Sequence, residues 1–100
     1  MNRLVWTLES RDDLLAIRDF IAKDAPKTAE SFVDRITETA QRLKQFPLLG
    51  AVVPEMDDEN IRELRCGPYR LIYRTKSKRI EILAVHHGSR LLDPFRFDEA

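Results

Sequence analysis

The chain has 100 residues, of which 43% are hydrophobic, and its 17 basic residues balance its 17 acidic residues. A chain of this length forms one domain (residues 1–100) with one modest core, which excludes a cofactor-binding domain joined to a separate substrate domain. It contains no run of the ~20 apolar residues that span a membrane and no apolar signal segment near residue 1, so we expect a cytoplasmic protein with no membrane partner.

The first expected elements are a strand and a helix. Residues 3–7 predict a short strand, because Leu4, Val5 and Trp6 are apolar, β-branched or aromatic. Ser10 followed by Asp13 resembles a helix-capping pair, and we expect the first helix to begin there. Its apolar residues recur every three or four positions until about residue 23: Leu14, Ile17, Phe20 and Ile21.

A second helix is expected from Pro26, since proline suits the first helical position. Its apolar stripe comprises Ala29, Phe32, Val33, Ile36, Ala40 and Leu43. Pro47 disfavours helical backbone in the residue before it, so the helix should end near Phe46. Residues 51–60 then resemble an acidic loop. The two helices should form an antiparallel hairpin whose shared apolar face is covered by a sheet.

The remainder predicts three strands, at residues 61–65, 69–75 and 79–87, joined by two hairpin turns. Alternation places Leu71 on one face of the middle strand and Arg70 on the other, which predicts one packed face and one partly basic face. The last strand has apolar residues in both alternating sets, so it should lie centrally. Residues 91–95 are apolar enough to pack back on the domain or to meet a partner. The fold class is therefore α+β, ordered β-α-α-β-β-β, with an antiparallel three-stranded meander.

Charge is unevenly distributed along the chain. Residues 1–60 contain 8 basic and 12 acidic residues, whereas residues 61–100 contain 9 basic and 5 acidic residues. The C-terminal part therefore forms a cationic surface that attracts anions over about 8–10 Å. The alternative is an ordinary solvated sheet face. Cys66 is the only cysteine, which excludes an internal disulfide and fits a reducing compartment.

Two segments carry a family resemblance. Residues 64–74 (LRCGPYRLIYR) and 80–90 (IEILAVHHGSR) resemble the C-terminal signature of RelE/ParE toxins. Asp13 and Leu14, Ala29 and Phe32 in the helices, and the stop at residues 46–50 (FPLLG) occupy comparable places. The resemblance covers essentially the whole chain. The ending at residues 86–90 (HHGSR) is more similar to the ParE branch, which implies the toxin of a type II toxin–antitoxin pair.

The resemblance leaves the target open. ParE-like members poison DNA gyrase without chemistry of their own, whereas RelE-like members cleave mRNA on the ribosome; a non-toxic binding module is the third reading. RNA cleavage needs a base, an acid and cations, for which the candidates are Arg65, Arg74, His86 and His87. Without catalysis, the expected target contacts are Arg65, Arg70, Arg74 and Arg90.

Each of these candidates has a structural alternative. Adjacent strand positions face apart, so at least one of His86 and His87 should be structural, and the pair is a poor metal site. Arg90 has an acidic loop, residues 55–59, as a competing ion-pair partner. We expect neither a metal nor a cofactor. Arg65 and Arg74 remain the favoured target contacts.

The resemblance also implies a partner. Such toxins pair with a small ParD-like antitoxin that folds on binding, and the resemblance also allows toxin–antitoxin hetero-oligomers. A segment that folds on binding commonly lays an amphipathic helix in an apolar groove. The expected antitoxin contacts lie on the helix hairpin: Leu14, Ile17, Ile21, Phe32 and Ile36.

Overall fold

The structure, a computed structural model, describes residues 2–97. Its elements follow in the order β1 (Arg3–Trp6), α1 (Leu8–Ala22), α2 (Pro26–Arg42), β2 (Ala51–Val52), β3 (Ile61–Cys66), β4 (Tyr69–Lys76), β5 (Arg79–His87) and a short 3-10 helix, η1 (Pro94–Phe97). The strands form one sheet in the order β1-β5-β4-β3-β2. The predicted α+β fold is confirmed, and β5 lies between β1 and β4 as expected.

Two features of the sheet were not predicted. β1 pairs in parallel with β5, so the sheet is mixed and not wholly antiparallel. The short strand β2 pairs with β3 at Glu63 and Arg62, within the segment expected to be a loop. Both pairings add an edge to the predicted meander.

The helices follow the predicted hairpin, with corrected ends. The side chain of Thr7 accepts a hydrogen bond from the Ser10 amide at 3.1 Å, so Thr7 caps α1, three residues before the predicted cap Ser10. Threonine is a good cap because its hydroxyl satisfies a free amide of the first turn. α2 begins at Pro26 as expected but ends at Arg42, and the chain continues to Phe46 in tighter turns.

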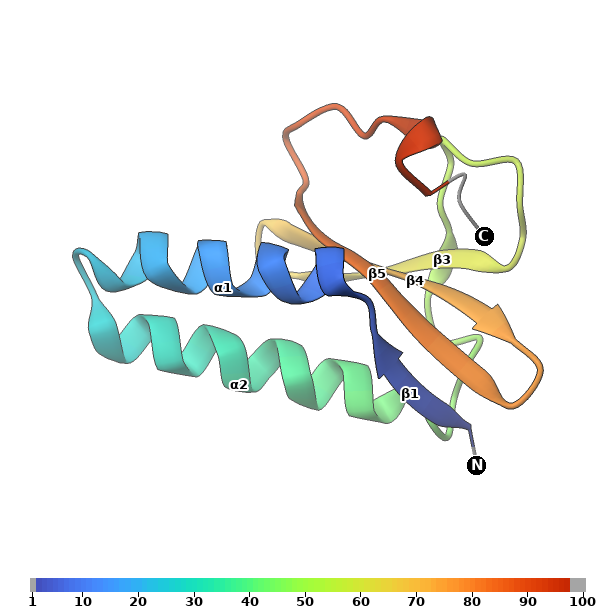
Figure 1. The fold of residues 1–100 in the computed structure, drawn as a ribbon, viewed down its shortest axis with the longest axis horizontal. Coiled ribbons are helices and arrows are strands. Elements are labelled where there is room, and N and C mark those ends of the chain that lie inside the picture. The colour runs from blue at the N-terminus through green and yellow to red at the C-terminus, as the bar shows by residue number, and fades with distance from the viewer. Residues whose placement is uncertain (1, 98–100) are drawn as a thin grey trace.

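The helix hairpin covers one face of the sheet. Figure 1 shows α1 and α2 antiparallel and side by side, with their connecting turn at the left, far from the β4–β5 hairpin. The buried core on this face comprises Phe32, Ile36, Ala40, Leu43, Cys66, Leu71, Tyr73, Ile80, Ile82 and Val85. Tyr73 is buried because its hydroxyl is satisfied: it donates to Pro47 O and accepts from the Gly50 amide, each at 2.9 Å.

The face predicted to be partly basic does carry Arg70 and Arg74, but it is also packed, because a second, smaller core lies on it. This core comprises Val53, Ile61, Ile72, Leu83, Ala84, Leu92 and Phe97. The C-terminal 3-10 helix lies on the other side of β5 from α2 (Figure 1). Leu92 is buried there, so this part of the tail packs back on the domain, while Leu91 is 98% exposed. The side chain of Phe95 lies outside the described residues.

A β-bulge in β5 reverses its alternation. Ile72 pairs with Ala84 but Tyr73 pairs with Ile82, so Leu83 is an extra residue in the strand. Strict alternation would place Ala84 with Ile82, whereas the bulge sends Leu83 and Ala84 together to the second core. Within residues 2–97, no helix is both long and apolar enough to cross a bilayer.

Candidate functional site

The N-terminal part of α1 forms hydrogen bonds with the edge of β5 where β1 no longer pairs with it. The pairing of β1 with β5 ends at Trp6 and Ile82. Beyond this point Asp13 Oδ2 accepts the Val85 amide at 3.0 Å, and the Thr7 hydroxyl donates to Ile82 O at 2.9 Å. An exposed strand edge is a template for pairing with other chains. Side chains of the first turns of α1 therefore take over from a strand neighbour.

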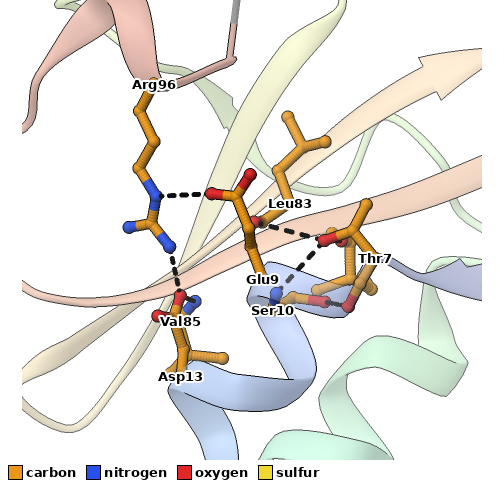
Figure 2. A network of polar contacts seen from close by, with 8 residues as sticks. Thr7, Glu9, Ser10, Asp13, Leu83, Val85 and Arg96 are labelled. Atoms are coloured by element: carbon orange, nitrogen blue, oxygen red, sulfur yellow. Dashed lines mark hydrogen bonds and ion pairs between the residues drawn. The ribbon is translucent and has the colours of Figure 1, made fainter. Parts of the chain in front are cut away.

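The same carboxylate of Asp13 holds the C-terminal 3-10 helix. Figure 2 shows Arg96 reaching both Asp13, at 2.7 Å, and Glu9, at 3.3 Å. Burial by itself lowers the pKa of Arg96, but hydrogen bonding to Asp13 and the charges of Asp13 and Glu9 outweigh it and raise that pKa. Asp13 thus joins α1, β5 and the C-terminal segment at one point.

An open groove of about 700 Å³ runs beside this junction, lined by Asp13, Ala16, Ile17, Phe20, Tyr69, Val85, His86, His87, Ser89, Arg90 and Arg96. One wall is the apolar side of α1, where Phe20 is 70% exposed. The other wall is polar and includes the end of β5. A groove with an apolar wall and a cationic rim suits an amphipathic, acidic segment.

The two histidines occupy opposite faces of β5, as predicted. His87 is paired with Tyr69 across the strands and stacks edge-on against its ring, with centroids 5.2 Å apart. His87 Nδ1 accepts the Ser89 amide at 3.1 Å, which places the proton of the neutral ring on Nε2. His86 Nε2 lies 3.1 Å from Arg90 O. Both rings are held by local contacts.

A second hollow of about 580 Å³ lies at the other edge of the sheet and contains Arg65, Arg70 and Gly88. Arg70 is buried: it forms a two-pronged ion pair with Glu55, at 2.8 and 2.9 Å, and another with Glu63. The hydrogen bond from Arg70 lowers the pKa of Glu55, and the hydrogen bond to Glu55 raises the pKa of Arg70. Arg70 therefore fastens the loop after β2 onto the sheet and has little surface left for a target.

The arginines expected to contact a target do not gather in one place. Arg65 is exposed and approaches Gly88 so closely that a Cβ there would lie 2.5 Å from its Nη1. Arg74 lies towards the far end of β4, where it donates to Phe97 O at 2.8 Å and pairs with Glu81 at 3.5 Å. Arg90 is exposed at the groove rim. The four catalytic candidates likewise fail to converge: Arg65 and the histidines share one end of the sheet, and Arg74 occupies the other.

The residues expected to bind an antitoxin divide by burial. Ile36 is fully buried and Phe32 is 8% exposed, both against the sheet. Leu14, Ile17 and Ile21 are partly buried and pack on the same core. The large apolar side chains that α1 leaves exposed are Leu8, Leu15 and Phe20. The predicted stripe marked the core at Leu14, Ile17 and Ile21, but Phe20, predicted in the same stripe, is exposed. The exposed apolar residues are the surface open to a partner.

Two polar residues at these sites, Glu63 and Arg96, were missed from the sequence. Glu55, expected in the acidic loop as a partner for Arg90, pairs with Arg70. Asp13 was noted only as part of a helix start. Their partners lie seven to 87 positions away along the chain, and nothing in the local sequence indicates which charges meet. Among the described residues, no group of three His, Cys, Asp or Glu side chains could hold a metal ion.

Comparison with known proteins decides the family. Residues 4–92 match the family described as ParE toxin of type II toxin-antitoxin system, parDE. The chain belongs to the ParE toxin family. The match extends from β1 through both helices and the whole sheet to Leu92. The family predicted from the sequence is confirmed, and the chain is a type II toxin–antitoxin toxin of the ParE/RelE superfamily.

Individual relatives belong to the same ParE/RelE superfamily. Toxin RelE2 of Caulobacter vibrioides (strain ATCC 19089 / CIP 103742 / CB 15) is 30% identical over 92 residues, covering 91% of this chain and 100% of that protein. The chromosomal ParDE TA system from P. aeruginosa contains a chain with 31% identity and a TM-score of 0.74, covering 87% of this chain and 96% of that one.

A more distant structure, the YoeB/ParE toxin from Agrobacterium tumefaciens, has 25% identity and a TM-score of 0.57, with 85% of this chain and 96% of that chain covered. The YoeB dimer from Staphylococcus aureus, at 12% identity and a TM-score of 0.60, shares the fold, with coverage of 86% and 95%. Names from both branches of the superfamily thus occur among the relatives.

Proposed function

We propose that this ParE-family chain arrests growth by poisoning DNA gyrase and is neutralised by a ParD-like antitoxin. The observation that supports it is the separation of the catalytic candidates. Arg74 is engaged by Glu81 and by Phe97 O, away from Arg65 and the histidines. General acid–base cleavage requires its groups within hydrogen-bond reach of one substrate. A toxin that acts by binding has no such requirement.

The mRNA endonuclease is the second candidate, and one observation favours it. Arg65 and His87 both lie beside Gly88, Arg65 through its close approach and His87 as the preceding residue. A cation and a titratable ring near one another can bind and cleave a phosphodiester. The relative named Toxin RelE2 gives this candidate further support.

One experiment separates the two candidates. The chain is induced in cells from which the adjacent gene is absent, and DNA damage response and mRNA integrity are followed in parallel. A gyrase poison induces the damage response and leaves messages intact, and the purified chain blocks supercoiling or traps cleaved DNA. Codon-phased mRNA cuts that vanish in His87→Ala and Arg65→Ala would replace gyrase by the ribosome as the target. Normal growth would show that the chain is a non-toxic binding module.

The antitoxin is proposed to occupy the groove beside α1. Its apolar wall includes Ile17 and Phe20. Arg90 gives the rim a positive charge for an acidic segment. Phe20→Ala and Arg90→Gln are expected to weaken the complex with the product of the adjacent gene, measured by calorimetry, without unfolding the chain. Unchanged affinity in both variants would place the antitoxin elsewhere.

A further inference from the structure

The end of the sheet at the β4–β5 turn carries a row of cations that the proposed function does not use. Arg3 of β1 pairs with Arg79 of β5, and Arg79 pairs with Lys76 of β4, so three cations lie side by side across three neighbouring strands. Neighbouring strands are about 4.8 Å apart, which gives the row a span of about 10 Å between the outer backbones. Figure 1 shows the start of β1 beside this hairpin.

The row lies on the sheet face away from the helices. Leu4 and Trp6 of β1 pack with the helix-side core, so Arg3 faces the opposite way. In β4, Arg74 and Lys76 alternate with Tyr73 of that core and share the face of Ile72. The loop after β2 and the C-terminal segment cover Ile72, whereas Arg3 and Lys76 remain exposed.

The cationic side chains at this end of the sheet outnumber the carboxylates that pair with them. Glu81 is the shared partner of three cations, at 3.5 Å from Arg74, 3.9 Å from Lys76 and 3.1 Å from Arg79. Arg3, and Lys78 in the turn, have no ion pair among residues 2–97. Nε of Arg79 is buried and donates to no described group. Like charges opposite one another in a sheet are destabilising. A bound anion would relieve this repulsion.

The chemistry of the row indicates which anion it fits. A peptide that folds on binding needs apolar side chains as anchors. The row consists of cations only and provides no such anchor. Single-stranded nucleic acid is usually held by aromatic rings that stack on bases. The aromatic residue of β1, Trp6, packs on the helix side. A flat cationic array without stacking rings suits contacts to phosphates, which carry no base information.

We propose that this row, Arg3, Lys76 and Arg79, binds the phosphodiester backbone of a nucleic-acid duplex independently of sequence. The contact would keep the toxin on nucleic acid without depending on which target it poisons. It is therefore separable from the proposed function: a variant that loses duplex binding can still meet gyrase or the antitoxin through other surfaces.

The test measures binding of the full chain to a fluorescent 20-base-pair DNA duplex, and to an RNA duplex of equal length, by anisotropy between 50 and 200 mM salt. Each phosphate contact adds about −0.9 to the slope of log affinity against log salt. Three contacts predict an affinity loss of about 40-fold over this range, and Arg3→Gln/Lys76→Gln is expected to reduce that loss to about 4-fold. The DNA and RNA arms identify the source of the phosphates.

The matched control is Lys23→Gln/Lys27→Gln, which removes the same charge from exposed positions at the turn between α1 and α2. It should retain the steep salt dependence, and circular dichroism should show both double variants folded. Equal loss in the control would mean that net charge alone is responsible and would overturn the proposal. So would unchanged binding by Arg3→Gln/Lys76→Gln, absence of duplex binding at 50 mM salt, or tighter binding of poly-glutamate than of either duplex.

Discussion

The two faces of the sheet are held by different forces. On the helix side, the core is almost wholly apolar, and its one polar side chain, Tyr73, is satisfied by backbone groups. On the opposite side, a smaller apolar cluster is covered by a loop and a C-terminal segment that charges fasten: Arg70 to Glu55 and Glu63, and Arg96 to Asp13 and Glu9. The first face should tolerate changes of salt and pH. The second should respond to both.

The largest effect is expected from a cavity on the helix side. Ile36 is fully buried between α2 and the sheet, and Ile36→Ala should lower the free energy of unfolding by about 2–5 kcal/mol, measured by urea denaturation. Leu15→Ala, at a 45% exposed position of α1, is the control and should change stability little. Near-normal stability of Ile36→Ala with lost antitoxin binding would show that Ile36 is a contact residue after all.

Breaking the Arg70 cluster should be the next most severe change. Arg70→Met leaves the Glu63 carboxylate, whose side chain is 21% exposed, without its cation. The expected loss is about 2–3 kcal/mol, below the usual range for buried pairs because Glu55 can turn towards water. Adding Glu63→Gln should recover part of it. Arg18→Met, which breaks an exposed ion pair on α1, provides the comparison. Equal losses of stability in the two variants would show that the ion pairs of Arg70 stabilise the fold no more than an exposed pair does.

The same cluster should make stability depend on pH. The pKa of Glu55 is lowered in the folded chain by its hydrogen bond to Arg70. Its stabilising effect is therefore complete above the ordinary pKa of the unfolded chain, 4.5, and is lost as pH falls through the lower folded pKa. Urea midpoints from pH 7 down to pH 3 should decline less steeply for Glu55→Gln. Parallel profiles for the two proteins would contradict the assignment.

The smallest effect is expected at the ion pairs that hold the C-terminal segment, Arg96 with Asp13 and Glu9. Asp13→Asn keeps an oxygen that can accept the Val85 amide but removes the charge that faces Arg96. A loss of about 1 kcal/mol is expected, accompanied by faster amide exchange or proteolysis in residues 91–97. Glu9→Gln, at the longer and more exposed pair, should have less effect. Unaltered protection of the segment in Asp13→Asn would mean that Leu92 and Phe97 hold it alone.

Local pattern was enough for most of the fold. The apolar stripe of α2 predicted Phe32, Ile36 and Ala40 as one buried face, because helical spacing aligns such residues whatever they pack against. Pro26 and the turns at residues 67 and 77 marked where elements begin and end. The capping threonine was missed because Thr7 and Ser10 are both good caps, and only the path of the chain after β1 chooses between them.

The candidate site depended more on tertiary structure. Its residue types, arginines and histidines near the end of the chain, could be chosen from sequence, but their neighbours could not. Arg65, Arg70 and Arg74 have similar local sequence, yet one is exposed, one is buried between two glutamates and one caps the C-terminal segment. The ion-pair partner of a charged residue in a strand depends on which other strands and loops the fold places beside it.

The sequence by itself determined the family, the helix hairpin, the three main strands and the central place of β5, since these follow from periodicity, turn residues and motif order. Only the tertiary structure decided the second core, the parallel pairing of β1 and the assignment of each arginine to a clamp or to the surface. The reason is physical: one inserted residue at Leu83 reverses which face the following side chains occupy. Ion pairs between residues far apart in the chain form only once folding has brought them together.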